Sequence, residues 1–116
     1  MKQKLKYVAT ILLACFVSDG YADNDQIYNR SIKVISTYST FAIIYYKPSF
    51  SGTQGCINGN NDSGVLRFDN PQQREMFSTL LAAASANSNK IGFGISGCDT
   101  GNSLNRPKIY RIDITF

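Results

Sequence analysis

The chain has 116 residues, with 12 Lys and Arg against 8 Asp and Glu, and it contains no His and no Trp. This length is enough for one small domain and excludes a large multi-domain enzyme. The absence of histidine removes imidazole metal ligands, histidine-assisted nucleophiles and the commonest general base, so we expect no catalysis, no metal site and no other cofactor.

The first 22 residues have the three parts of an export signal. Three lysines in the first six residues form a basic head, residues 7–17 form an apolar core, and Gly20 and Ala22 place small residues where a signal peptidase reads the chain. Those eleven apolar residues are too few to cross a bilayer core of about 30 Å as a helix. We therefore expect residues 1–22 to be cleaved, residues 23–116 to form a single domain, and the protein to enter the periplasm and then be secreted.

A second interpretation of the same segment is a lipoprotein signal. The sequence Leu12-Leu13-Ala14-Cys15 resembles a lipobox, in which Cys15 would be acylated and become the first mature residue. The bulky Leu13 fits that motif poorly, and an unpaired cysteine behaves as a small apolar residue that suits a signal core. The residues therefore favour cleavage after Ala22.

Strands are predicted at residues 32–37 and 40–47, because both segments are rich in Ile, Val, Thr, Tyr and Phe and only two residues separate them. Pro48 ends the second strand. The Gly- and Asn-rich stretch at residues 49–63 is typical of an exposed loop, and a third strand follows at residues 64–68.

One helix is predicted next. Asn70 can cap its free amide groups, Pro71 suits the first helical position, and Gln73 has the spacing of a capping box. The sequence Asn-Ser-Asn at residues 87–89 ends the helix. Between these limits, apolar residues recur at helical spacing and predict one stripe packed on a sheet, made of Met76, Phe77, Leu80, Leu81 and Ala84.

Two more strands are predicted at residues 90–96 and 108–116, with a polar loop at residues 99–105 between them. In the first of these strands Ile and Phe alternate with Gly and Ser, which leaves one nearly bare face open to close approach. The last strand carries apolar side chains on both faces. These elements predict a mainly β, α+β domain, a small partly open barrel of five to six strands with one helix packed across it.

The mature chain keeps two cysteines, Cys56 and Cys98. An even pair in a small exported domain favours a disulfide, which in the chain-entropy treatment stabilises the fold by about 4 kcal/mol for a loop of this length. Without the signal, which holds three lysines and Asp19, nine basic and seven acidic side chains remain, a net charge of +2. No basic run is left to neutralise a row of phosphates, so we expect no nucleic acid partner.

The sequence offers two kinds of candidate site, one catalytic and one for binding. The carboxylates that could act in catalysis are spread over different predicted elements and belong to no recognisable motif; they are Asp62, Asp69, Glu75, Asp99 and Asp113. A binding role is better supported, because hydroxyl, amide and cationic groups gather beside aromatic residues near the first two strands, at residues 28–31, 47 and 51–53. Carbohydrate recognition uses such groups, since hydroxyls and amides bind sugar hydroxyls and a lysine or arginine pairs with an acidic sugar.

The segment Ser31–Cys56 resembles the family of toxin B subunits that includes those of typhoid toxin, the pertussis-like toxins and subtilase cytotoxin. The likeness continues through residues 75–84 and 91–95 and so covers most of the mature chain. The residues of the first segment that carry it are Val34-Ile35-Ser36, Phe41, Ile43, Lys47, Ser51-Gly52-Thr53 and Cys56.

The resemblance implies a B subunit with an oligomer-binding (OB) barrel that assembles as a homopentamer, binds sialylated glycans on host cells and delivers a separate catalytic A subunit. It also implies glycan-binding residues. Ser31 matches the serine that contacts the sialic acid carboxylate, Lys47 matches a lysine of that pocket, and Thr53 matches a threonine beside it.

The chain departs from the family pattern at two positions. Asn29 stands where the family has a binding tyrosine, and Gly92 stands where it has an arginine. Tyr28, one position before Asn29, is expected to supply the missing ring, so Tyr28 and Asn29 complete the set of candidate glycan-binding residues. These departures bear directly on sugar preference.

Two other classes of function stay open. One is a small periplasmic or surface protein, such as an inhibitor or an envelope-binding module, with the same barrel and no A subunit; it would be a monomer or dimer without glycan affinity. The other is an exported enzyme, which would need carboxylates clustered in a cleft. The neighbouring gene separates the first from a toxin subunit, because an adjacent ADP-ribosyltransferase or subtilase-like reading frame would supply the A subunit.

Overall fold

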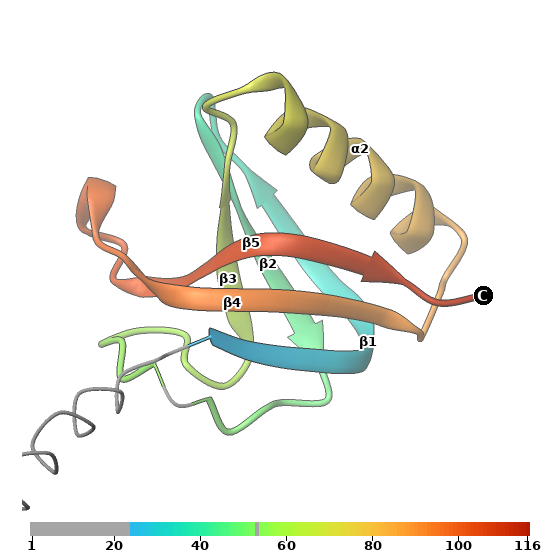
Figure 1. Ribbon diagram of the computed structural model, residues 1–116, viewed down its shortest axis with the longest axis horizontal. Helices are drawn as coiled ribbons and strands as arrows, with labels where there is room; N and C mark the ends of the chain where they lie inside the picture. Colours follow the sequence, from blue (N-terminus) through green and yellow to red (C-terminus); the bar gives the residue numbers. More distant parts are fainter. Residues whose placement is uncertain (1–23, 53) are drawn as a thin grey trace, which may run out of the picture.

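The computed structural model describes residues 24–52 and 54–116 (Figure 1). The predicted signal and Cys15 lie outside these residues. The described elements follow in the order β1 (Asn24–Thr37), β2 (Phe41–Lys47), β3 (Ser63–Arg67), α2 (Pro71–Ser85), β4 (Ile91–Asp99), the short 3-10 helix η2 (Gly101–Ser103) and β5 (Arg106–Ile114).

The five strands form a ring in the order β1-β2-β3-β5-β4, and β4 pairs with β1 to close it. Four of the five strand pairs are antiparallel. The fifth, between β3 and β5, is parallel and has one register pair, Val65 with Lys108, so the ring is closed only by a thin seam. The prediction of a small, partly open, OB-like α+β barrel with one helix is confirmed.

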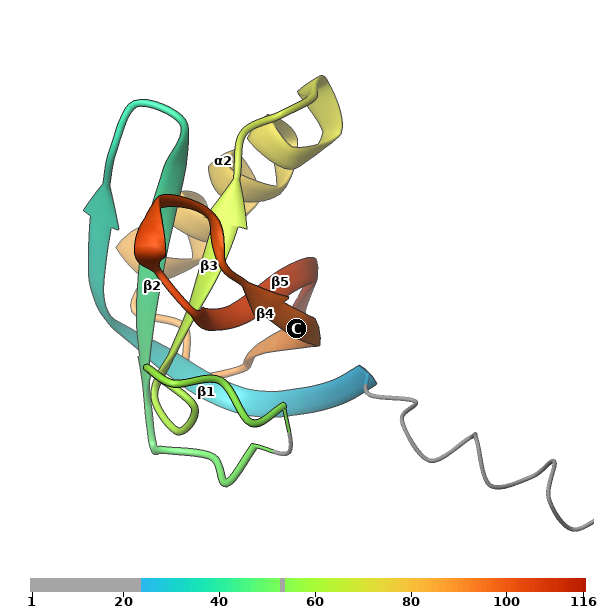
Figure 2. The same cartoon turned by 90° about the vertical axis from the view of Figure 1, so that its left-hand side faces the viewer.

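Apolar side chains from all five strands and from α2 fill the interior of the barrel. The helix covers one end of the ring, and the β2–β3 loop lies at the other end (Figures 1 and 2). Burial of this apolar surface is the main force that holds so small a domain together. The buried core residues are Ile27, Ala42, Ile44, Tyr46, Leu66, Leu80, Ala83, Ile91, Phe93, Ile95 and Ile109.

The start of α2 is as predicted, but its buried apolar face differs from the predicted one in which residues it contains. The Gln73 amide donates to the Asn70 side-chain oxygen at 2.8 Å, which satisfies one free helical N–H, and Pro71 begins the helix. Leu80 is fully buried, and Met76 and Phe77 pack against the core, as expected. Leu81 is 41 % exposed, however, and Ala83 is buried in its place. Leu80 and Ala83 are three residues apart and therefore share one face of the helix, and Leu81 lies outside that face.

Three strands differ from their predicted bounds by more than one residue. β4 ends at Asp99, three residues after the predicted end at residue 96. β1 begins at Asn24, eight residues before the predicted start at residue 32, because the mostly polar residues 24–30 are held extended by pairing with β4. β5 spans Arg106–Ile114 in place of residues 108–116. In each case hydrogen bonding to a neighbouring strand outweighs local propensity.

A bulge in β5 explains why apolar residues occur at both odd and even positions of that strand. Ile95 pairs with Ile109 and Gly94 pairs with Arg111, so Tyr110 is the extra residue. The extra residue reverses the alternation of side chains. As a result Ile109 before the bulge and Ile112 after it both pack on the core.

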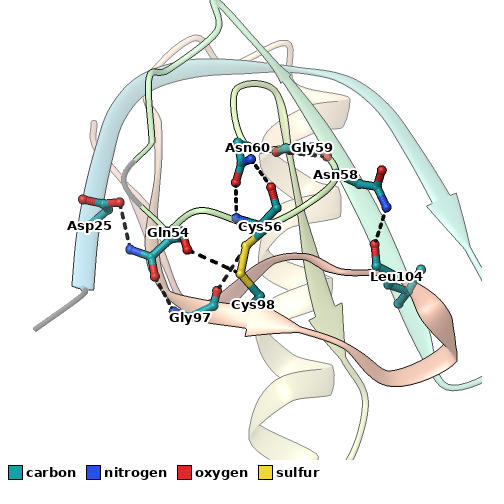
Figure 3. The surroundings of a disulfide bond; sticks show 10 residues. Asp25, Gln54, Cys56, Asn58, Gly59, Asn60, Gly97, Cys98 and Leu104 are labelled. Atoms are coloured by element: carbon teal, nitrogen blue, oxygen red, sulfur yellow. Dashed lines mark hydrogen bonds between the residues drawn. A yellow bond between two sulfur atoms is a disulfide. The ribbon is translucent and has the colours of Figure 1, made fainter. Parts of the chain in front are cut away.

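The predicted disulfide is present: the sulfur atoms of Cys56 and Cys98 are 2.01 Å apart (Figure 3). It fastens the β2–β3 loop to β4. Gln54 adds two further links, since its side-chain oxygen accepts from the Gly97 amide at 2.6 Å and its nitrogen donates to Asp25 of β1 at 2.9 Å (Figure 3). The loop predicted as merely exposed is therefore held against one end of the barrel.

Candidate functional site

Three of the candidate glycan-binding residues, Tyr28, Asn29 and Ser31, lie on β1, and Lys47 is the last residue of β2. β1 changes partners along its length. Residues 24–30 pair with β4, and residues 31–37 pair with β2. An irregularity between Ile27 and Arg30 separates the two halves, and within it Asn29 has a φ of 58°. This left-handed conformation suits asparagine better than most residues that carry a Cβ atom. Asn29 therefore has a clear role in the backbone of the bend.

Two of the candidate residues are brought together on the β2 half of β1. Ser31 is the register partner of Lys47 in the antiparallel pair. Both line a shallow, mainly polar hollow of about 210 Å³, whose other lining residues are Ile32, Ala84, Asn87 and Ser88. Sites that enclose a drug-sized ligand hold about 300–1,000 Å³, so this hollow suits a single small ring with one side left in solvent.

The end of α2 forms the opposite wall of this hollow, a contact between distant segments that no local sequence signal indicates. Asn87 has a φ of 57°, and its amide donates to the Ala84 carbonyl at 3.0 Å. The Ser88 amide donates to the Ala83 carbonyl at 3.0 Å, and the Ser88 hydroxyl accepts from the Lys90 amide at 3.1 Å. The Asn-Ser-Asn sequence indicated only a helix stop; that the stop faces β1 depends on how α2 packs.

Lys47 is the cation of the hollow. Its side chain is exposed, and over residues 24–52 and 54–116 the ion pairs are Arg67 with Asp99 and Arg111 with Asp113. The Lys47 ammonium group is thus left to pair with a negatively charged group supplied from solution. The Ser31 hydroxyl beside it can donate to the same group or accept from it.

Tyr28 lies on the other half of β1 and does not line the hollow. A Cβ atom built on Gly92 would be 2.9 Å from the Tyr28 ring, so the ring packs on that glycine. Its hydroxyl donates to the side chain of Gln26. The structure therefore brings Ser31 and Lys47 together and places Tyr28 and Asn29 in the bend, outside the hollow. Thr53 lies outside the described residues.

Gly92, which stands where the resembled family has an arginine, lies at a sterically crowded position. A Cβ atom at this position would be 2.8 Å from the Ile27 carbonyl oxygen. That oxygen belongs to the backbone, so it can move away only if the strand moves with it. An arginine could not stand there without moving β1. Tyr28 occupies the space that such a side chain would cover.

Arg30 joins the bend of β1 to the start of the β2–β3 loop. Its guanidinium donates to the Tyr28 carbonyl at 2.6 Å and to the Ser49 carbonyl at 3.3 Å, and it lies 5.9 Å from the centroid of the Phe50 ring. These contacts hold the loop that contains Ser51 and Gly52 beside β1. The arginine is thus engaged in positioning the backbone around the candidate site.

Asp99 is the most buried of the carboxylates considered for catalysis. It is 6 % exposed and accepts from Arg67 Nε and Nη2, each at 2.7 Å. These hydrogen bonds, with a smaller contribution from the Gly101 amide, hold the pKa of Asp99 below its usual range. The group is therefore a stable anion in a structural ion pair.

In the described part of the chain, no group of three or more His, Cys, Asp or Glu side chains is arranged to hold a metal ion. The same residues include no helix with the length and apolar character needed to cross a membrane. Comparisons with protein-family models, with curated proteins and with solved structures found no match for this chain.

Proposed function

We propose that this protein is the non-catalytic, receptor-binding B subunit of a bacterial A-B type toxin. In this proposal it binds sialylated host glycans as a homopentamer and delivers a separate catalytic A subunit. The OB-like barrel and the Cys56–Cys98 disulfide are consistent with the family that the segment Ser31–Cys56 resembles.

One observation supports the proposal most strongly, the opposition of Ser31 and Lys47 at the rim of a polar hollow. A sialic acid presents one carboxylate and several hydroxyls. The Lys47 ammonium and the Ser31 hydroxyl match the carboxylate, because a charge-assisted hydrogen bond is about twice as strong as a neutral one. The amide and hydroxyl side chains of Asn87 and Ser88 match the sugar hydroxyls.

A ring of five copies would compensate for the shallowness of each site. Sites on one scaffold bind a glycan-bearing surface with an effective concentration set by their spacing, so avidity can exceed the affinity of one site by a factor of about 10² to 10⁴. A hollow that holds one sugar ring is then sufficient for attachment to a cell.

The test combines two measurements on the purified protein, its native mass by light scattering and its binding to an array of sialylated and neutral glycans. A mass of five chains together with sialoglycan binding is the expected result. A monomer or dimer without glycan binding would overturn the proposal and favour the small periplasmic or surface binding protein.

A further inference from the structure

The outer face of β1, β4 and β5 carries a second cluster of side chains, on the far side of the β1 bend from the hollow. Gln26 of β1, Gly94 of β4 and Arg111 of β5 are register partners in one row across the three strands. In the next row Gly92 is the partner of Asp113. The central strand thus contributes a glycine to both rows, so side chains from the flanking strands can lean over it.

Two tyrosine rings occupy the space above these glycines. The Tyr28 ring would be 2.9 Å from a Cβ atom on Gly92, and the Tyr110 ring would be 2.9 Å from a Cβ atom on Gly94. The bare face predicted for β4 is therefore covered by aromatic rings, and the bulge in β5 is what directs Tyr110 to this side. Tyr28 and Tyr110 are 48 % and 40 % exposed as residues, so each still offers area to a ligand.

A planar ion pair borders the rings. Arg111 Nε donates to both oxygens of Asp113, at 3.1 and 3.0 Å, and its Nη2 lies 3.0 Å from Asp113 Oδ2. The guanidinium carbon is 5.6 Å from the centroid of the Tyr110 ring. Both charged side chains are about one-third exposed, at 35 % and 31 %, so they present hydrogen-bonding groups at the edge of the rings with no net charge between them.

We propose that this surface, made of Gln26, Tyr28, Tyr110, Arg111 and Asp113, is a second carbohydrate-binding site that takes neutral pyranose rings. Aromatic rings favour the C–H faces of a sugar, while the amide, guanidinium and carboxylate groups bind its hydroxyls. The two tyrosines cover alternate positions of one strand, which suits two linked sugar rings. A protein partner would need about 800 Å² on each side with an apolar centre, and the polar border of this surface does not provide one.

This inference rests on the proposed function in one respect, that the ligand is a carbohydrate. The two sites share no residue, so one can bind its sugar without the other. Charge separates them. The hollow holds Lys47, which forms no ion pair within residues 24–52 and 54–116, and suits an acidic sugar, whereas the Arg111–Asp113 pair is neutral and suits an uncharged one. Each site can therefore be probed with its own sugar.

The experiment is an NMR titration of the purified protein with lactose, a neutral disaccharide, and separately with methyl sialoside, an acidic monosaccharide. Lactose is expected to shift the amide signals of Gly92 and Gly94. Tyr110→Ala should weaken lactose binding about tenfold or more, Tyr110→Phe should keep it within about twofold because the ring remains, and Ser31→Ala should leave it unchanged.

Three results would overturn the second site: lactose causes no shifts, lactose binding survives Tyr110→Ala, or Tyr110→Ala changes the native mass, which would make the rings a contact between copies. Failure with lactose while methyl sialoside still shifts residues of the hollow removes the second site alone. Failure with methyl sialoside while lactose still shifts β4 removes the sialic acid site of the proposed function alone.

Discussion

Ser31 and Lys47 face each other across β1 and β2, whereas Tyr28, three residues before Ser31, packs on β4. The bend at Asn29 is the cause, because β1 pairs with β4 before the bend and with β2 after it. Residues that are close in sequence thus belong to two surfaces. The first surface has a lysine, Lys47, without an ion-pair partner among the described residues, and the second has two exposed tyrosines beside a neutral ion pair.

Ser31→Ala should remove most sialoglycan binding and leave the fold and native mass unchanged. The substitution deletes a hydroxyl that lines the hollow and is not part of the buried core, so it costs the ligand a hydrogen bond of about 1 kcal/mol or more to a charged group. Glycan-array binding of the variant checks this. Ser36→Ala is the matched control, since Ser36 lies on the same strand opposite Ile43, outside the hollow. Equal binding by both variants would show that the site is elsewhere.

Reduction of the disulfide should lower the melting temperature by about 15 °C or more. The bond closes a separation of 42 residues, which in the chain-entropy treatment is worth about 4 kcal/mol, and 1 kcal/mol corresponds to about 4–8 °C in a domain of this size. Calorimetry with and without reductant measures the shift. In the double variant Cys56→Ser with Cys98→Ser, reductant should have no further effect; a persistent effect would place the sensitivity elsewhere.

Asp99→Asn should reduce the stability of the protein at neutral pH and flatten its dependence on acid. Because folding lowers the pKa of Asp99, the ionised carboxylate stabilises the fold above the ordinary aspartate pKa of about 3.9, and that contribution is lost as the pH falls through the lower pKa of the folded state. We expect a loss of about 2 kcal/mol at pH 7, measured by urea unfolding.

Asp113→Asn is the control for this prediction. The Asp113 carboxylate is also paired with an arginine but is 31 % exposed, and exposed ion pairs contribute less than about 1 kcal/mol. Unfolding curves for the two variants at pH 7 and at pH 3 separate the cases. An equal effect of both substitutions would contradict the distinction between a buried and an exposed pair.

Leu80→Ala should destabilise the protein by about 3 kcal/mol, whereas Leu81→Ala should change its stability by less than about 0.5 kcal/mol. Leu80 is fully buried in the core, and Leu81 is 41 % exposed. Denaturant unfolding of the two single variants measures both values. A large loss for Leu81→Ala would mean that its side chain is covered in the assembled protein, since the isolated chain leaves it exposed.

Several elements were evident from the sequence because their signals are local. The cap at Asn70, the alternation of Ile91, Phe93 and Ile95 with small residues, and the even pair of mature cysteines each depend on residues near one another or on a simple count. Backbone hydrogen bonding and burial act on such patterns almost independently of the rest of the fold. The helix start, the buried residues of β4 and the disulfide could therefore be predicted from the sequence.

Other features depend on pairing and packing between distant segments, and only the tertiary structure decided them. The first half of β1 is polar and becomes a strand because β4 supplies hydrogen-bonding partners. The bulge at Tyr110 reverses the faces of β5, and Ala83 replaces Leu81 at the contact of α2. The meeting of Ser31, Lys47 and the end of α2 in one hollow also depends on tertiary structure, because the packing of α2 on the core places the helix stop beside β1.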